Sequence, residues 1–276
     1  MNDSMNGSKS KTSMAYDDYG QGFPVLLIHG HPFNRTMWTP QVQSLRWKYR
    51  TIVPDLRGYG ESAPSPAIDA YTQERYAADL VALLDDLGVK QACVVGLSMG
   101  GQIAMEFARA FPERTAALVL AATFAESETP QGIIERNRAA ERIETKGIVP
   151  IGTEMLPKLL GRKAIKENPA LALQIFTMIC STNPSGAAAA VRGRAMRQDY
   201  RPSLQSFLNP AMLVLGTDDS YTSVANGKKL QASMPDCRLE VFQDIGHMPN
   251  LEAEDRFNEC LHSFLESIER MTPTNS

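Results

Sequence analysis

The chain of 276 residues lacks the features of several protein classes. It has no apolar run approaching the roughly 20 residues that a membrane-spanning helix needs, and residues 1–13 have no apolar core of the kind found in signal peptides. It has no basic excess, because 28 Lys and Arg face 31 Asp and Glu, giving a net charge of −3. Nucleic acid and membrane are therefore not expected as partners, and the cytoplasm is the expected location.

Cysteine and histidine are also scarce. The four cysteines lie far apart and form neither a C-x-x-C pair nor a mixed Cys and His ligand pattern, so the sequence predicts no metal site and no disulfide framework. Nothing indicates a cofactor or an oligomeric state, and we expect a small-molecule substrate as the partner. A catalytic base would have to come from a set of only four histidines: His29, His31, His247 and His262.

The composition is otherwise ordinary for a globular protein. Apolar residues make up 43% of the chain and charged residues 21%, and a chain of this length can bury a sizeable core. We predict one large core formed by residues 14–125 and 208–270, with residues 126–207 inserted into it. The polar residues 1–13 and 271–276 are predicted to be flexible tails.

Apolar segments of strand length alternate with helical patterns along the core. This alternation predicts an α/β fold with a mostly parallel central sheet that is flanked by helices on both faces. Within residues 126–207 the alternation stops and only helical patterns remain, which predicts an all-helical insertion. The predicted strands are residues 24–28, 50–54, 92–95, 117–122, 211–215 and 238–242, and the predicted helices of the insertion are residues 132–146, 151–160, 170–181 and 185–198.

The most informative stretch is GLSMG at residues 96–100, which lies between a predicted strand and a predicted helix. A serine at such a sharp turn adopts a strained backbone conformation, and small flanking residues let the strand and the helix pass closely. The hydroxyl of Ser98 would then project beyond the sheet edge, next to the N–H of Met99 at the start of the helix. This arrangement is typical of a nucleophilic serine in acyl transfer.

A base and an acid to activate Ser98 are found at the ends of later strands. His247 follows the strand 238–242 and Asp219 follows the strand 211–215. Because the carboxyl ends of parallel strands meet at one edge of a sheet, these side chains can approach Ser98, and the chain order Ser, Asp, His agrees with such a triad. Glu126 also follows a strand end and is the alternative acid.

Five motifs in this order resemble the α/β-hydrolase family over residues 15–270. The likeness is to the branch with a serine nucleophile, which includes esterases and lactonases and carries a helical lid. The motifs are specific for the fold but say little about the substrate, since one fold serves many reactions. They are HGHP at residues 29–32, DLRGYGES at 55–62, GLSMGG at 96–101, GTDD at 216–219 and GH at 246–247.

The resemblance implies roles for further residues. The backbone N–H groups of His31 and Met99 would form an oxyanion hole, and the peptide bond before Pro32 would be cis. Residues 126–207 would be a helical lid over the site.

The sequence departs from its relatives at one place in the acid loop. Relatives usually carry a proline four residues after the acid, where this chain has Ser223. The dehalogenase and epoxide hydrolase branches are similar at the HGHP motif, but their nucleophile is an aspartate. Ser98 therefore argues against both of those reactions.

The function that we expect is hydrolysis of a small to medium, largely apolar ester or lactone through an acyl-enzyme intermediate. Ser98 would be the nucleophile, His247 the base and then the acid, and Asp219 the residue that orients the imidazole. The same triad could serve a cofactor-free perhydrolase or haloperoxidase, or a carbon–carbon bond hydrolase; a catalytically silent binding protein is the remaining alternative. The apolar candidates for substrate binding are Phe33, Phe124, Met155, Phe176, Met178 and Ile179.

Overall fold

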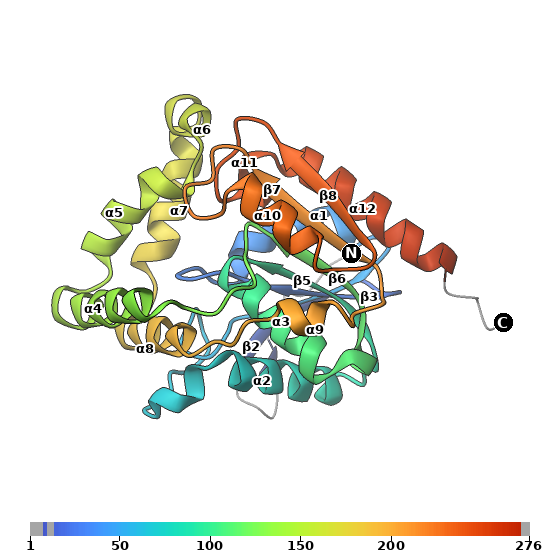
Figure 1. Cartoon of the computed structure of the whole chain (residues 1–276), viewed down its shortest axis with the longest axis horizontal. Helices are drawn as coiled ribbons and strands as arrows, with labels where there is room; N and C mark the ends of the chain where they lie inside the picture. Colours follow the sequence, from blue (N-terminus) through green and yellow to red (C-terminus); the bar gives the residue numbers. More distant parts are fainter. Residues whose placement is uncertain (1–7, 10–13, 272–276) are drawn as a thin grey trace.

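The structure is a computed structural model that describes residues 8–9 and 14–271. At its centre is an eight-stranded sheet in the order β1-β2-β4-β3-β5-β6-β7-β8 (Figure 1). The strands from β3 to β8 are parallel, as the sequence predicted, whereas β1 and β2 join the sheet in antiparallel pairs. The strands are β1 (Ser8–Lys9), β2 (Ala15–Tyr19), β3 (Pro24–Ile28), β4 (Arg50–Pro54), β5 (Ala92–Leu97), β6 (Thr115–Ala121), β7 (Ala211–Gly216) and β8 (Cys237–Phe242). Flexible tails were predicted at residues 1–13 and 271–276. Residues 1–7, 10–13 and 272–276 lie outside the described residues, whereas Ser8 and Lys9 pair with β2 as a short strand and Met271 ends α12.

The sequence pattern did not indicate β2, because it contains two consecutive aspartates, and aspartate is rare in strands. Both carboxylates are paired in the structure. Asp18 accepts hydrogen bonds of 2.8 and 3.0 Å from Arg50 on the neighbouring β4, and Asp17 accepts one of 3.1 Å from Arg35. These ion pairs offset the low strand propensity of the segment.

The sheet has a hydrophobic layer on each face, because successive side chains of a strand point to opposite sides. In β3, Val25 and Leu27 belong to one buried cluster, while Leu26 and Ile28 belong to the other. The first cluster is covered by α1 (Thr39–Leu45) and α12 (Glu254–Met271), and the second by α2 (Gln73–Asp86), α3 (Met99–Ala110) and α10 (Val224–Gln231). The remaining short helices of the core are η1 (Arg35–Trp38), η2 (Ile68–Tyr71), η3 (Pro112–Arg114) and α11 (Pro249–Glu252).

Only helices occur between β6 and β7, and α4 to α8 lie on the left of Figure 1. Three of them begin at a proline that follows a capping residue: the side chains of Thr129, Asn168 and Asn183 accept hydrogen bonds from N–H groups of the first turn. The bounds of the four longer helices lie close to the predicted ones, and α6 and α9 were not predicted. The helices are α4 (Pro130–Lys146), α5 (Val149–Leu159), α6 (Arg162–Glu167), α7 (Pro169–Cys180), α8 (Pro184–Ala195) and α9 (Arg201–Leu204).

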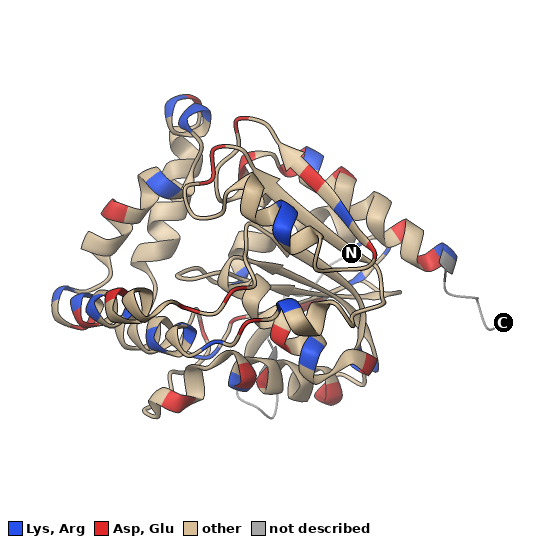
Figure 2. Cartoon of the chain, in the orientation of Figure 1, with Lys and Arg blue, Asp and Glu red and all other residues tan. Residues whose placement is uncertain are grey.

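Acidic and basic residues are interspersed on the outer helices, and both signs occur along α4 (Figure 2). Within residues 8–9 and 14–271, no helix combines the length and the apolar character that a membrane span requires. The surface of the described chain therefore carries mixed charge, as its nearly balanced composition predicts.

Candidate active site

The turn between β5 and α3 has the strained geometry that the sequence predicted. Ser98 has φ 55° and ψ −113°, a conformation that costs an ordinary L-residue free energy. A Cβ atom on Gly96 would lie 2.2 Å from the carbonyl oxygen of Gly100, and a Cβ on Gly100 would lie 2.2 Å from that of Ile28. Glycine at both positions is thus a steric requirement of the turn.

We expect Gly96→Ala to lower the free energy of unfolding by about 3 kcal/mol, because the new methyl group meets backbone atoms that cannot move without displacing the helix. Gly88→Ala is the matched control. Gly88 has φ +66°, but no atom lies within 4 Å of the place that its new methyl group would occupy, so only the backbone strain of about 1 kcal/mol remains. Urea unfolding of both variants measures the difference, and equal losses would contradict the steric argument.

His247 and Asp219 lie in the loops that follow β8 and β7. The Nδ1 atom of His247 is 2.9 Å from Oδ2 of Asp219 and 3.0 Å from Oδ1. The Asp219 side chain is fully buried, and its Oδ1 also accepts hydrogen bonds of 2.7 and 3.0 Å from the N–H groups of Tyr221 and Thr222. A carboxylate held in this way fixes the imidazole so that Nδ1 carries the proton and Nε2 is free to act as a base.

The other candidate carboxylates are placed elsewhere. The Glu126 carboxylate is 3.8 Å from Arg201, and that of Asp218 is 3.7 Å from Arg162. No hydrogen bond joins either of them to His247 in the described chain. Ser223, which replaces the usual proline, caps α10 by accepting a hydrogen bond of 3.2 Å from the N–H of Asn226.

Two backbone N–H groups of the site have no acceptor. The HGHP loop lies against the turn at Ser98, since a Cβ on Gly30 would be 3.4 Å from the Cβ of Ser98. The peptide bond between His31 and Pro32 is cis. Within residues 14–271, neither the N–H of His31 nor that of Met99 donates a hydrogen bond to a protein group. Both donors are therefore not used by any protein group of the described chain.

The imidazole of His31 faces the cavity as well. Its Nδ1 shares a hydrogen bond of 2.7 Å with the Tyr59 hydroxyl. Burial, followed by the positive charges of Arg194 and Arg136, holds the pKa of His31 well below its usual range. The ring is therefore neutral at physiological pH and adds no positive charge to the site.

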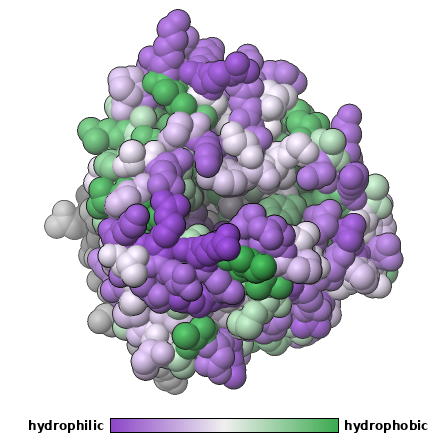
Figure 3. All heavy atoms as spheres, turned by 60° about the vertical axis from the view of Figure 1, so that its left-hand side comes forward, coloured by the Kyte–Doolittle hydropathy of each residue, from purple (hydrophilic) through white to green (hydrophobic). Residues whose placement is uncertain are grey.

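Ser98 and His247 open into one cavity of about 250 Å³. Of the six apolar residues expected to bind substrate, Phe124 and Met155 line it. It adjoins an outer cavity of about 470 Å³, because both share five lining residues. Figure 3 brings the side with α4 to α8 forward and shows a hollow bordered largely by hydrophilic residues.

The other four apolar candidates are not among the residues that line the cavity of Ser98. Phe33 and Ile179 are fully buried in the hydrophobic core, and Phe176 lies beside Gly152 where α7 packs on α5. Met178 borders a separate surface pocket near Asn34. Their side chains face neighbouring elements. The apolar character of these four residues therefore reflects packing and not substrate binding.

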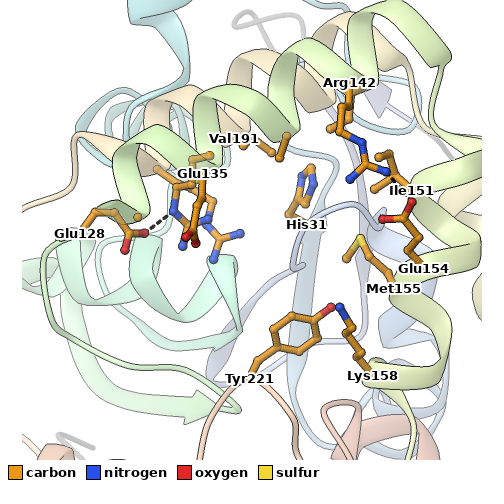
Figure 4. Close-up of a pocket in the computed structure, with 15 residues that line it drawn as sticks. His31, Glu128, Glu135, Arg142, Ile151, Glu154, Met155, Lys158, Val191 and Tyr221 are labelled. Carbon is orange, nitrogen blue, oxygen red and sulfur yellow. Dashed lines mark hydrogen bonds and ion pairs between the residues drawn. The ribbon is translucent and has the colours of Figure 1, made fainter. Parts of the chain in front are cut away.

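Sequence reasoning missed the charged lining of the site. Arg136 and Arg194 line both cavities, and so does Tyr221, whose ring is 4.9 Å from that of His247. Figure 4 shows that Tyr221 and Lys158 point toward each other at the lower edge of the outer cavity. A helical pattern marks such residues as polar, but it does not distinguish a face toward solvent from a face toward a cavity.

One carboxylate connects the His247 loop to the helical insertion. Glu252 in α11 accepts three backbone hydrogen bonds: 2.7 Å from Gly161, 3.1 Å from Gly246 and 3.1 Å from Met248. The N–H of His247 itself donates to the carbonyl of Leu159 at 2.8 Å. The end of α5 is therefore fixed to the loop that carries the predicted base.

Glu252→Gln should lower the free energy of unfolding by about 1–3 kcal/mol, because both carboxylate oxygens accept N–H groups and the new amide NH₂ must face one of those donors. The control is Glu254→Gln, which changes an exposed carboxylate two residues away. Thermal unfolding of the two variants measures the effect. A loss no larger than that of the control would mean that the three hydrogen bonds do not stabilise the loop.

Comparison with known proteins identifies the family of the chain. The sequence model described as the alpha/beta hydrolase fold matches residues 24–254. A thermophilic esterase from Thermogutta terrifontis, in a malate-bound structure, is 36% identical with a TM-score of 0.90, and the match covers 92% of this chain and 93% of that one. The 3-oxoadipate enol-lactonase 2 of Acinetobacter baylyi is 28% identical over 92% of this chain and 93% of its own length.

A further relative carries a different activity in its name. The putative non-heme bromoperoxidase BpoC of Mycobacterium tuberculosis is 27% identical, and the match covers 93% of this chain and 98% of the relative. The names of these three relatives thus give an esterase, an enol-lactonase and a putative bromoperoxidase. From the match over residues 24–254 and the likeness to these proteins, the chain belongs to the α/β hydrolase fold family and is an enzyme of the carboxylic ester hydrolase type.

Proposed function

We propose that the protein is a serine hydrolase that cleaves a small to medium ester or lactone through an acyl-enzyme. The observation that carries this proposal is the placement of Ser98 in one cavity with His247, whose Nδ1 is held by the buried carboxylate of Asp219. The backbone N–H groups of His31 and Met99, which donate to no protein acceptor within residues 14–271, support an oxyanion hole in the same site.

The proposed reaction has two stages. In the first, Nε2 of His247 takes the proton of Ser98 while Oγ attacks the carbonyl carbon of the substrate, and the N–H groups of His31 and Met99 stabilise the oxyanion. His247 then returns the proton to the leaving alkoxide, which departs from the acyl-enzyme. In the second stage His247 takes a proton from a water molecule as the water oxygen attacks the acyl carbon. His247 then returns this proton to Oγ of Ser98 as the bond between Oγ and the acyl carbon breaks and the acid leaves.

The helical insertion supplies one wall of this site. The inner cavity is lined by Met155 and Leu159 of α5, Arg136 of α4 and Arg194 of α8, together with Ser98. We propose that residues 126–207 form a lid which excludes bulk water and limits the size of the acyl or alcohol group. A volume of about 250 Å³ favours a small substrate over a long acyl chain.

Perhydrolysis is a second candidate, favoured by the likeness to a protein named as a non-heme bromoperoxidase. Hydrogen peroxide would replace water in the second stage and would yield a peracid from the same acyl-enzyme. Supplying an ester together with hydrogen peroxide distinguishes the two, because peracid forms only if peroxide competes with water at the acyl carbon.

Labelling with a fluorophosphonate tests the proposed nucleophile directly. The Oγ of Ser98 should form a bond to phosphorus while fluoride leaves. The mass of the intact protein should therefore rise by the mass of one phosphonyl group. Peptide mapping should place the adduct on Ser98. Ser98→Ala should gain none, whereas Ser206→Ala, which changes an exposed serine in the turn after α9, should label normally. A folded wild-type protein that stays unlabelled and hydrolyses no ester or lactone in a panel contradicts the proposal.

A further inference from the structure

Arg194 lines the inner cavity together with Ser98, and it has no acidic partner among the described residues. Its Nε donates a hydrogen bond of 3.2 Å to Oε1 of Gln102. Across residues 14–271, no carboxylate lies within ion-pair distance of its guanidinium, and its two Nη groups donate to no protein acceptor. A cation in a cavity that contains a reactive serine, with most of its donors unused, is poised to bind an anion.

The position of Arg194 is fixed by close packing of the helix that carries it. A Cβ on Gly193 would lie 2.0 Å from the carbonyl oxygen of Tyr71, and one on Gly186 would lie 2.3 Å from that of Gly58. The backbone of α8 therefore packs directly on the core at two points. Gln102, which holds the guanidinium, lies in the first turns of α3, the helix that begins after Ser98. Both anchors belong to rigid elements, so Arg194 is held relative to the nucleophile.

The second arginine of the cavity, Arg136, shares its acidic partner. Glu128 forms an ion pair with Nε of Arg136 and accepts a hydrogen bond of 3.0 Å from Nη1 of Arg197. One carboxylate thus serves two guanidinium groups, and Arg194 is not among them. Figure 4 shows Glu128 at the far left of the outer cavity, with a dashed line to its partner.

The charges that face the two cavities differ. In the outer cavity Arg142 pairs with Glu154, and Glu135 accepts a hydrogen bond of 3.0 Å from Gln131. The inner cavity is lined by Arg136 and Arg194 and by no carboxylate at all among the described residues. Positive charge is therefore concentrated beside Ser98, while the outer rim is nearly balanced.

The pKa of Arg194 is consistent with an excess of positive charge in the inner cavity. Burial first, and then the charges of Arg136 and Arg197, lowers the pKa of Arg194. The ordinary pKa of a guanidinium is so high that the group remains charged at neutral pH. A desolvated cation without a partner is unfavourable, and an anion that enters the cavity removes this penalty.

We propose that Arg194 and Arg136 form an anion subsite beside Ser98, and that the substrate is a short ester or lactone which carries a free carboxylate. This inference rests on the proposed hydrolase function and narrows it. A substrate with a carboxylate differs from the largely apolar substrate expected from the sequence. Only part of the expected apolar lining is present, and two guanidinium groups also line the inner cavity. The planar fork of a guanidinium matches a carboxylate, which can accept two hydrogen bonds from it.

The test compares pairs of substrates in which a free carboxylate is replaced by a neutral methyl ester. Monomethyl esters of succinic, glutaric and adipic acid carry a free carboxylate, and their dimethyl esters are the neutral counterparts. For at least one of the three acids, wild-type kcat/KM should be about 10- to 100-fold higher on the monoester than on the corresponding diester. This is the range expected for hydrogen bonds to a charged group. The length of the best monoester gives the distance between Ser98 and the subsite.

Variants assign that preference to the arginines. Arg194→Gln should lower kcat/KM on the best monoester by about 10- to 100-fold, mainly through KM, and its loss on the neutral diester, which has no free carboxylate, should be several-fold smaller. Arg138→Gln is the control, since Arg138 is exposed on α4 and lines neither cavity. Arg136→Gln should show a smaller loss with the same selectivity. A further arm measures thermal stabilisation of Ser98→Ala by glutarate and by inorganic phosphate, and the proposal expects glutarate to stabilise at lower concentration.

The outcomes separate this inference from the function on which it rests. The wild type could take the fluorophosphonate label but show the same kcat/KM on diesters and on monoesters. This result would contradict the proposed anion subsite and leave the proposed hydrolase function intact. An unlabelled wild type would overturn the hydrolase itself. Equal losses on both esters in Arg194→Gln would show a structural role, and stabilisation by phosphate alone would exclude a carboxylate ligand. If the arginine variants fail to fold, the preference of the wild type for a monoester over its diester tests the anion subsite by itself.

Discussion

Ser98→Ala should lower kcat on the best ester of the panel by about 10⁶-fold, the largest effect that we expect from any single substitution. Without Oγ no acyl-enzyme forms, and what remains is binding together with the oxyanion donors at His31 and Met99. The alanine removes only a hydroxyl group and fits the same turn, so the fold should persist. Initial rates with wild-type contamination excluded, together with circular dichroism, measure both properties.

Two further variants sharpen this prediction. The double variant Ser98→Ala with His247→Ala should be no slower than the single one, because a base without its nucleophile contributes nothing. Ser206→Ala should retain wild-type kcat, since that serine is exposed in the turn after α9. Activity of Ser98→Ala within tenfold of wild type would place the nucleophile on another residue.

The parts of the site that could be predicted from sequence are those that local sterics or strand order determine. The GLSMG turn follows from the space that Gly96 and Gly100 leave for the backbone, and that requirement is visible in five residues. The positions of Asp219 and His247 follow from the rule that parallel strands end at one edge. Neither inference depends on how distant helices pack.

The lining of the cavity could not be predicted, because it depends on how each helix of the insertion is rotated. Met178 and Ile179 are apolar and were predicted to line the pocket. In the structure Met178 borders a separate surface pocket and Ile179 packs in the hydrophobic core. Arg194 is charged, and it lines the same cavity as Ser98. The close contact of Gly193 with the core sets the rotation of α8, and that contact spans more than a hundred residues of sequence.

The core strand β2 shows the same limit at the level of the fold. Its aspartates argue against a strand when only neighbours in sequence are considered. Their partners, Arg35 and Arg50, lie 18 and 32 residues away along the chain. Pairings over such distances decide the outcome, and a local pattern does not contain them.

The second large effect that we expect concerns the acid of the triad. Asp219→Asn should lower kcat by about 10⁴-fold without unfolding the protein. The reason lies in the two backbone donors at Oδ1: the N–H groups of Tyr221 and Thr222 hold the amide oxygen of the new asparagine at that position. Its NH₂ group then faces Nδ1 of His247, where Oδ2 stands in the wild type.

An amide donor at Nδ1 reverses the tautomer of His247. The ring must accept at Nδ1 and therefore carries its proton on Nε2, where it can no longer take the proton of Ser98. Glu126→Gln and Asp218→Asn are the matched controls, since their carboxylates lie near Arg201 and Arg162 instead of His247. Each control should lose less than tenfold in kcat, about 1.4 kcal/mol. A crippled Glu126→Gln beside an active Asp219→Asn would move the acid to the loop after β6 and leave Ser98 and the fold unchanged.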